Sequence, residues 1–332
     1  MLLRHQRTKE AIVKRTFVLS ALCIALLTST ALGEVQTRQV RFENEGEPLV
    51  GTLYAPTGRS ANERFPGVVV TGAWTSIKEQ MSGLYAREMA ERGFVALAFD
   101  FRGWGQSGGR VRFKEEPTAK ISDILAAAVF MATLPEVDPA RISGLGICAS
   151  AGYMAAAASV SANIASVGLV APWLHDADIV RQVYGGEEGV HRLIETSQRA
   201  EASEAAGKPQ VILAASATDR TALMFQVPYY TEMDRGLIPE YDNKFNLASW
   251  EPWLTYDSVV IADRLHKPTL MVHSEAAAVP QGAHAFFNRL PGHSFELWLD
   301  NVSQFDFYDR PEPVAAAADA VAAHFERFGK EL

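Results

Sequence analysis

The pattern of apolar and polar positions predicts an α/β protein with a mainly parallel central sheet. Two alternating stretches, residues 35–42 and 48–54, are typical of an antiparallel hairpin with one polar face. After them, short apolar runs alternate with segments of helical spacing. The strands are expected at 65–71, 94–99, 141–146, 165–172, 268–273 and 294–299, and the helices at 80–92, 121–134 and about 311–328. Strands that alternate with helices form a parallel sheet covered on both faces, and we expect that architecture here.

The alternation stops between about residues 173 and 265. This stretch contains helical fragments and loops rich in aromatic side chains, namely Tyr229, Tyr230, Tyr241, Phe245, Trp250, Trp253 and Tyr256. We interpret residues 173–265 as a cap inserted into a core formed by 34–172 and 266–332. The aromatic side chains either pack the cap or line a pocket for an acyl group, and packing is the expected role for most of them.

Residues 1–33 are predicted to be a signal peptide that is cleaved near Gly33. Five basic residues precede an apolar run of 11 residues at 17–27, and a small-x-small cleavage site follows at 31–33. The run is short for a membrane span, although an uncleaved anchor is the alternative. Cys23 follows Leu22 rather than a small residue, which argues against a lipid anchor. We therefore expect an exported protein, most simply a periplasmic one, without stable membrane insertion after cleavage.

Composition limits the partners and cofactors of the protein. The 332 residues carry a net charge of −8, and removal of residues 1–33 leaves 26 basic and 38 acidic residues, a net charge of −12. An acidic chain without a basic patch is a poor binder of nucleic acid. Only Cys148 remains after cleavage, so no internal disulfide can form. Neither a CxxC motif nor clustered His and Cys indicates a metal site, and no cofactor is predicted.

The candidate chemistry centres on the turn at residues 146–150, Gly-Ile-Cys-Ala-Ser, between an expected strand and an Ala-rich helix. A tight strand-to-helix turn with small residues indicates a nucleophile elbow, whose strained central residue presents its side chain to substrate. Cys148 is central, and a thiol at a helix N-terminus can have a lowered pKa. Two alternatives remain: Ser150 as nucleophile in a register shifted by two residues, and Cys148 as an inert buried thiol.

Several motifs together resemble the α/β-hydrolase superfamily. Residues 65–72 resemble the strand that carries the oxyanion loop, residues 100–109 resemble the D-x-R-G-x-G-x-S-x-G turn, and residues 138–142 lead into the elbow in the family's register. The cysteine elbow is similar to that of dienelactone hydrolases. Lys-Glu-Gln-Met at 78–81 is more similar to the branch with Xaa-Pro-peptidase-like and polyketide-transferase-like proteins. The resemblance covers roughly residues 40–332 apart from the cap, and it implies the α/β-hydrolase fold.

The resemblance also implies positions for an oxyanion hole and for a catalytic acid. Two backbone N–H groups should stabilise the developing negative charge, one from Ala149 and one from Ala73 or Trp74. The family's aspartate is expected near Ala276, where Glu275 is the only carboxylate in the loop. Glu275 is therefore either a displaced substitute for that acid or a solvated loop residue.

The catalytic base is the main departure from the family. Gln304 occupies the position of the family's histidine, and a glutamine cannot take a proton at neutral pH. His175 follows an expected core strand and is the substitute, with Asp176 or Asp178 to orient its ring. A structural histidine at the hinge of the cap is the alternative. His273, deep in an expected strand, and His284, on an expected helix, are predicted to be structural, and His293 precedes the last strand at the wrong end of the sheet.

Two functional hypotheses follow. The first is a Cys148-dependent hydrolase or acyltransferase that acts on a small ester, thioester or lactone, with His175 as base or with a pre-formed thiolate. The second is a catalytically degenerate hydrolase that binds an apolar carboxyl ligand beneath its cap. The first predicts a reactive thiol, whereas the second predicts an unreactive thiol and no turnover.

Overall fold

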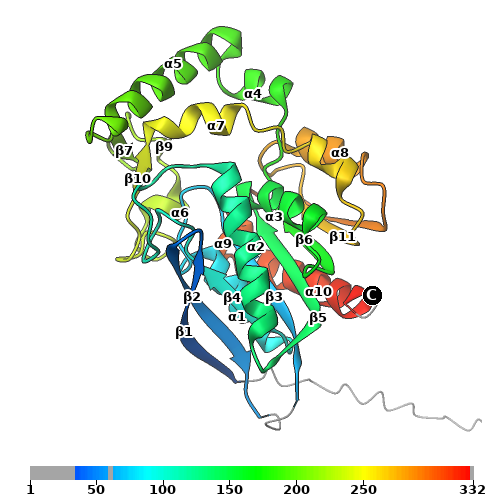
Figure 1. The fold of residues 1–332 in the computed structure, drawn as a ribbon. Coiled ribbons are helices and arrows are strands. Elements are labelled where there is room, and N and C mark those ends of the chain that lie inside the picture. Colours follow the sequence, from blue (N-terminus) through cyan, green and yellow to red (C-terminus); the bar gives the residue numbers. More distant parts are fainter. Residues whose placement is uncertain (1–33, 59–62, 330–332) are drawn as a thin grey trace, which may run out of the picture. The chain divides into compact units, whose positions relative to one another are not determined.

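The computed structural model describes residues 34–58 and 63–329, and its centre is an eight-stranded sheet (Figure 1). The strand order is β1-β2-β4-β3-β5-β6-β11-β12. These strands span Val35–Asn44, Glu47–Pro56, Val95–Phe99, Phe65–Thr71, Val137–Ile147, Ser166–Val170, Thr269–His273 and Ser294–Trp298 in that order. The predicted signal peptide, residues 1–33, lies outside the described residues and stays a prediction.

Six of the eight strands run parallel, as the alternation of strands and helices predicts. From β4 to β12 every neighbouring pair is parallel, whereas β1 pairs with β2, and β2 with β4, in antiparallel register. The central parallel strands β4, β6 and β11 are buried at every position. A strand buried on both faces needs apolar side chains on both, which explains its continuous rather than alternating apolar pattern.

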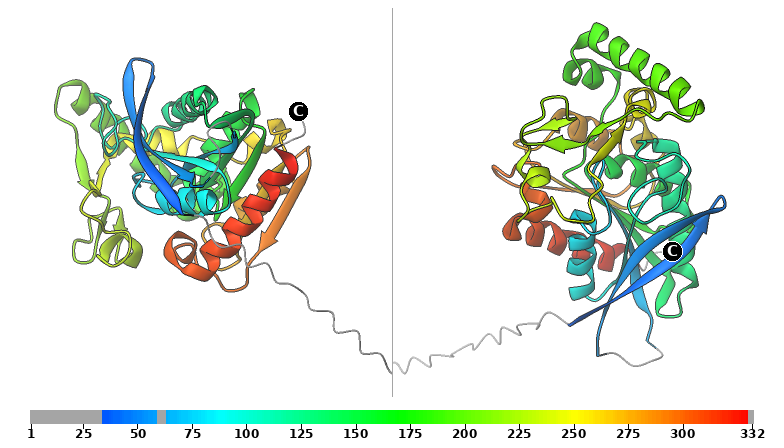
Figure 2. Two further views of the ribbon diagram at one scale, coloured as in Figure 1. Left: turned by 90° about the horizontal axis from the view of Figure 1, so that it is seen from below. Right: turned by 90° about the vertical axis from the view of Figure 1, so that its left-hand side faces the viewer.

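Helices cover both faces of the sheet. α1 and α10 pack against each other on one face, and α2 and α3 pack together on the other (Figure 2). The core helices are α1 (Met81–Glu91), α2 (Pro117–Thr133), α3 (Ala149–Val160), α8 (Pro280–Phe287), α9 (Asp306–Asp309) and α10 (Pro311–Phe328). The range of α10 agrees with the prediction, because Pro311 starts the helix and a regular apolar face continues to Phe328.

The segment between β6 and β11 contributes no strand to the large sheet in the described chain. It forms helices α4 (Ala177–Val183), α5 (Gly186–Ala205), α6 (Pro228–Thr231), α7 (Trp250–Leu254) and the 3-10 turns η1 (Leu247–Ser249) and η2 (Val260–Arg264). Its short strands are β7 (Val211–Leu213), β8 (Ala215–Ser216), β9 (Met224–Phe225) and β10 (Lys244–Asn246). They pair only with one another, β7 with β10 and β8 with β9. Figure 1 shows α4, α5 and α7 beyond the edge of the sheet at which β5 leads into α3.

Most aromatic side chains of this cap are buried, as expected for packing. Tyr229, Tyr230, Phe245 and Trp253 are each at most 2% exposed. Some of them also line the cavity described below, so packing and pocket lining are roles of the same side chains. None of the described helices is long and apolar enough to cross a bilayer.

Candidate active site

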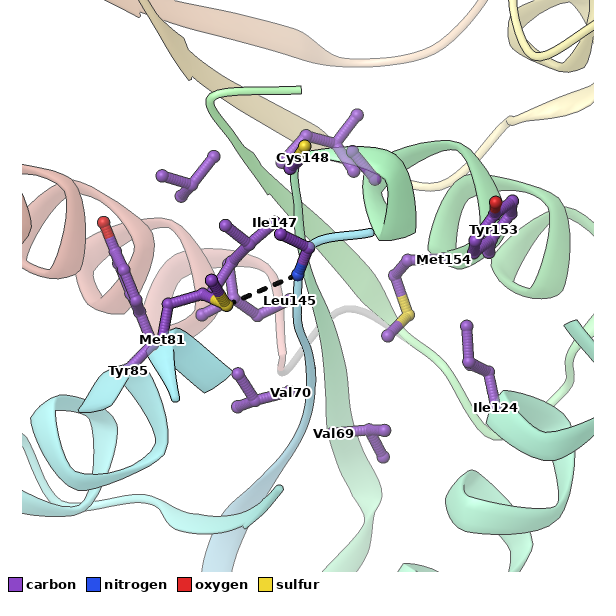
Figure 3. Close-up of a cluster of buried hydrophobic side chains, with 14 of the residues drawn as sticks. Val69, Val70, Met81, Tyr85, Ile124, Leu145, Ile147, Cys148, Tyr153 and Met154 are labelled. Atoms are coloured by element: carbon purple, nitrogen blue, oxygen red, sulfur yellow. Dashed lines mark hydrogen bonds between the residues drawn. The ribbon is translucent and has the colours of Figure 1, made fainter. Parts of the chain in front are cut away.

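Cys148 occupies the single-residue junction between β5 and α3. Its backbone has φ 57° and ψ −123°, a combination that L-residues rarely adopt, and its side chain is 6% exposed. Figure 3 shows Cys148 where strand β5 ends and helix α3 begins, directly after Ile147. This strained, tightly packed turn has the geometry expected of a nucleophile elbow.

Small residues allow this turn to close. A Cβ atom added to Gly146 would lie 2.7 Å from the Ser150 carbonyl oxygen and 2.8 Å from the Ala151 Cα. Both neighbours are backbone atoms of α3, so they cannot rotate away. The alternative nucleophile Ser150 is the second residue of α3, and its Oγ is buried without a hydrogen-bond partner. The junction residue that faces the cavity is therefore Cys148.

Three donors act on the Cys148 sulfur. They are the backbone N–H groups of Ala149 and Trp74 and the hydroxyl of Tyr308. The neighbouring N–H of Ala73 is directed elsewhere, to the Sδ of Met81 at 3.4 Å (Figure 3). Of the two oxyanion-loop positions predicted from sequence, the geometry thus favours Trp74 over Ala73.

Burial raises the pKa of the Cys148 thiol, although Tyr308 and the two N–H groups act in the opposite direction. The expectation that the helix N-terminus gives this thiol a lowered pKa is therefore wrong. Removing the sulfur from water disfavours the thiolate by more than the donors favour it. At neutral pH the resting group is a thiol, and its attack requires a route for its proton.

Gln304 organises the polar edge of the site. Its Nε2 donates to the Ala171 carbonyl at 2.8 Å and to the Tyr308 hydroxyl at 3.0 Å, and its Oε1 accepts from the Ala278 N–H at 3.0 Å. Every part of the amide has a partner. Because Tyr308 receives a hydrogen from Gln304, its own hydroxyl hydrogen remains available to the Cys148 sulfur.

Tyr308 is the functional residue that the sequence reasoning missed. It lies in the short helix α9, four residues after Gln304, and it is 2% exposed. That spacing is a signal, since residues four apart share one face of a helical turn. Burial raises the pKa of Tyr308 well above its ordinary value, so the phenol is a hydrogen-bond donor at neutral pH and not a base.

His175 does not serve as the predicted base, because both ring nitrogens have other partners. Nδ1 accepts from the Trp173 indole at 3.1 Å, and Nε2 donates to the Trp253 carbonyl at 3.1 Å. Its backbone exchanges hydrogen bonds with Ser258 at 2.8–3.1 Å. Burial lowers its pKa, which further disfavours uptake of a proton. His175 is the structural histidine at the cap's hinge, as in the alternative interpretation.

Glu275 also lies apart from Cys148. Its carboxylate pairs with Nε2 of His284 at 2.8 Å, and its side chain is 71% exposed. Both residues line a separate surface depression beside Trp298. The expected acid position is Ala276, so the described chain has neither the histidine nor the aspartate of a complete triad at these sites. The substitute roles predicted for Glu275 and His175 are corrected accordingly.

Cys148 opens into a cavity of about 730 Å³ between the core and the cap. Aromatic rings form much of its wall, namely those of Trp74, Trp173, Tyr184, Tyr230, Trp250, Trp253, Phe305 and Tyr308. The cap adds the aliphatic side chains of Val183, Leu193, Ile212, Leu223, Met224 and Leu247. No Asp, Glu, Lys, Arg or His among the described residues lines it. The cavity suits a neutral, apolar group and offers no side chain able to take a proton near pH 7.

The side chains near Cys148 in the described chain do not form a metal-binding group. Among residues 34–58 and 63–329, no group of three or more His, Cys, Asp or Glu side chains is placed to hold an ion. Cys148 has Tyr308 and backbone groups around it instead of further ligands. What the site does present is a thiol with hydrogen-bond donors around it.

Comparison with known proteins assigns the chain to a family. A family model described as X-Pro dipeptidyl-peptidase (S15 family) matches residues 45–303, most of the chain, and the protein belongs to that family. Uncharacterized protein PA2218 of Pseudomonas aeruginosa is 30% identical over 88% of this chain and 81% of its own. The crystal structure of PA2218 matches with a TM-score of 0.77 at 28% identity, over 89% and 94% of the two chains.

Two fungal proteins extend the comparison, one by its fold and one by its sequence. The structure of the α/β hydrolase GrgF from Penicillium sp. sh18 matches with a TM-score of 0.74 at 19% identity, over 88% of this chain and 99% of its own. Polyketide transferase claH of Penicillium crustosum is 32% identical over 36% of this chain and 39% of its own. The predicted α/β-hydrolase fold and the resemblance to the Xaa-Pro-peptidase-like and polyketide-transferase-like branch are confirmed. The family is described by a hydrolytic activity, so the protein is an enzyme of the hydrolase class.

The elbow geometry predicts that Gly146→Ala destabilises the fold. We expect a loss of about 1–3 kcal/mol in the free energy of unfolding, because the added methyl group overlaps backbone atoms of α3. The matched control is Gly168→Ala on β6, where the methyl group would meet only side-chain atoms of Phe325 and Val321 at 3.2 Å. Urea unfolding measures both. An equal or larger loss for Gly168→Ala would contradict the proposed tightness of the elbow.

The raised pKa of Cys148 predicts a slow and alkaline-shifted reaction with iodoacetamide. The midpoint of the pH profile should lie above about 8.5, the value of a free cysteine. Mass spectrometry of the peptide that contains Cys148 separates its reaction from that of Cys23. The urea-unfolded protein is the control and should follow the ordinary thiol profile. Tyr308→Phe should move the folded-state midpoint further up, and a downward move would refute the donor role of Tyr308.

Proposed function

We propose that Cys148 is the nucleophile of an acyl-transfer or hydrolytic enzyme that acts on thioesters, activated esters or lactones with an apolar acyl group. The observation that carries this proposal is the position of the thiol. It lies at the wall of a large apolar cavity, beside two backbone N–H groups and one phenol. Those N–H groups, from Ala149 and Trp74, are suited to stabilise the oxyanion that forms when the sulfur attacks a carbonyl carbon.

The composition of the cavity wall favours a substrate whose acyl group is neutral. A substrate with a free ammonium or carboxylate would bury that charge without an ionic partner, at a cost of several kcal/mol. This argues against a peptide with a free amino terminus as substrate, even though the family is described by that activity. It favours a flexible or cyclic hydrocarbon-rich chain that fits about 730 Å³ and packs against the aromatic wall.

The missing base restricts the leaving group. When Cys148 attacks, the bond from Sγ to the carbonyl carbon forms, the bond to the leaving group breaks, and the thiol proton finally resides on that leaving group. A thiolate, whose conjugate acid has a pKa of about 8.5, leaves without strong assistance. An amide nitrogen needs a general acid, and Gln304 cannot act as one. Thioesters, aryl esters and strained lactones are therefore the favoured substrates.

This proposal predicts a covalent acyl adduct on Cys148. Incubation with the phenyl thioester of hexanoic acid should increase the intact mass by one hexanoyl group, which peptide mapping should place on Cys148. Cys148→Ala should give no adduct at that peptide, which separates it from any reaction at Cys23. Absence of an adduct in the folded wild-type protein would refute the covalent function.

A second variant tests the cavity independently of the nucleophile. Leu193→Glu places a carboxylate in the cap wall and leaves Cys148 and Tyr308 untouched. We expect acylation by the hexanoyl thioester to slow by roughly tenfold or more, as a buried charge opposes an apolar chain. Leu193→Met preserves volume and polarity and is the matched control. Equal rates for both variants would show that the acyl chain does not occupy this cavity.

A second candidate function is binding without catalysis. It is favoured by one specific observation, the replacement of the family's base and acid positions by Gln304 and Ala276. In this case an apolar ester, or a carboxylic acid bound in its neutral form, occupies the cavity and quenches the tryptophans that line it, with no covalent adduct. The mass measurement distinguishes the two functions, since only the first adds an acyl group to Cys148.

A further inference from the structure

We propose that the acyl group leaves Cys148 on an incoming thiol and not on water, so that the protein exchanges acyl groups between thiols. This inference rests on the proposed function, because it needs an acyl-Cys148 intermediate. It decides between hydrolase and acyltransferase and names the acceptor class. The observation behind it is that three hydrogen-bond donors adjoin the sulfur, whereas no side chain of the cavity wall in the described chain is a base at neutral pH.

Release to water requires a group that takes a proton from water, whose pKa is 15.7. In the described chain the polar side chains of the cavity are Gln304, threonines, tryptophans and tyrosines besides Cys148 itself. The amide of Gln304 is not basic, and both of its ends are occupied. Burial raises the pKa of Tyr184, Tyr230 and Tyr308, so these phenols are protonated at neutral pH. Water therefore meets no general base at the acyl carbon.

A thiol acceptor does not need that base. A few per cent of a free thiol is already thiolate at pH 7, and sulfur is intrinsically nucleophilic. Its sulfur forms the new bond to the carbonyl carbon as the bond to Cys148 Sγ breaks, and the proton lost by the incoming thiol finally protonates Sγ. The products are a new thioester and free Cys148 thiol. Alcohols and amines are disfavoured, because at neutral pH alcohols stay protonated and amines are mostly ammonium ions.

Tyr308 and Gln304 are arranged to assist this exchange. Gln304 donates to the Tyr308 oxygen at 3.0 Å, which leaves the phenol hydrogen directed to the sulfur of Cys148. A phenol that favours the Cys148 thiolate also stabilises a sulfur that gains negative charge as it departs. In thioester exchange, Sγ departs from the acyl group in the release step. A phenol donor at Sγ is thus suited to this reaction and is no substitute for a base that activates water.

The test measures how acyl-Cys148 is lost. Hexanoyl-Cys148 is prepared with the phenyl thioester, freed of reagent, and followed by intact mass in buffer alone or with N-acetylcysteamine, propanol or ethanolamine at equal concentrations. We expect the thiol to remove the acyl group about 100-fold faster than buffer alone, because hydrolysis lacks the roughly 10²–10⁴-fold contribution of a general base. Propanol and ethanolamine should add little.

Two controls separate enzymatic exchange from ordinary thioester chemistry. A free thioester also reacts faster with thiols than with water, so the same acylated protein unfolded in urea supplies the unassisted rate with N-acetylcysteamine. The folded protein should exceed it. Tyr308→Phe should reduce this advantage and raise the alkylation midpoint of Cys148. A purely structural role of Tyr308 would leave that midpoint unchanged.

Gln304→His restores a base and should change the partition. With Ala276→Asp added to orient the imidazole, loss of the acyl group to buffer should increase by roughly 100-fold, the lower end of the general-base range. If buffer alone clears hexanoyl-Cys148 of the wild type as fast as the thiol does, or if the folded protein is no faster than the unfolded one, thiol transfer is refuted while the acyl-enzyme stands. If no acyl-Cys148 forms at all, both proposals fail.

Discussion

The site depends on the backbone of one residue, Cys148, held at φ 57° between β5 and α3. Its N–H donates to Val170 of β6 at 3.1 Å, and its carbonyl accepts from Trp173 at the start of the cap at 3.0 Å. The strained residue is therefore bonded to the neighbouring core strand and to the inserted segment. Gly146 and the small residues after it let α3 approach closely enough for this conformation.

Around this elbow, the polar groups form a network of donors. Gln304 is fixed by Ala171, Ala278 and Tyr308, and Tyr308 in turn acts on the sulfur. Fully satisfied buried networks of this kind hold their members in a single arrangement. The network is suited to stabilise negative charge on sulfur or oxygen, and none of its side chains takes up a proton at neutral pH. This is the physical difference between the present site and a site with a histidine and an aspartate at positions 304 and 276.

Much of the fold, and part of the site, follows from sequence. The strands near 65–71 and 269–273 and the last helix are marked by local patterns of apolar residues, which depend little on the rest of the chain. Cys148 and Ala149 are marked by the elbow's spacing. The partners of His175 are not predictable in this way, because Trp253 comes from a distant part of the cap. The sequence likewise could not tell that burial outweighs the helix N-terminus at the Cys148 thiol.

The contacts of His175 bear on how the two ends of the insertion are held. His175 lies just after the chain leaves the core, and Trp253 and Ser258 lie just before it returns. Buried hydrogen bonds thereby connect the first and last segments of the insertion where these meet the core. These bonds restrain the two ends of the insertion relative to each other. Side chains of α5 and of the short strands that follow it form part of the cavity wall, so a ligand in the cavity contacts them.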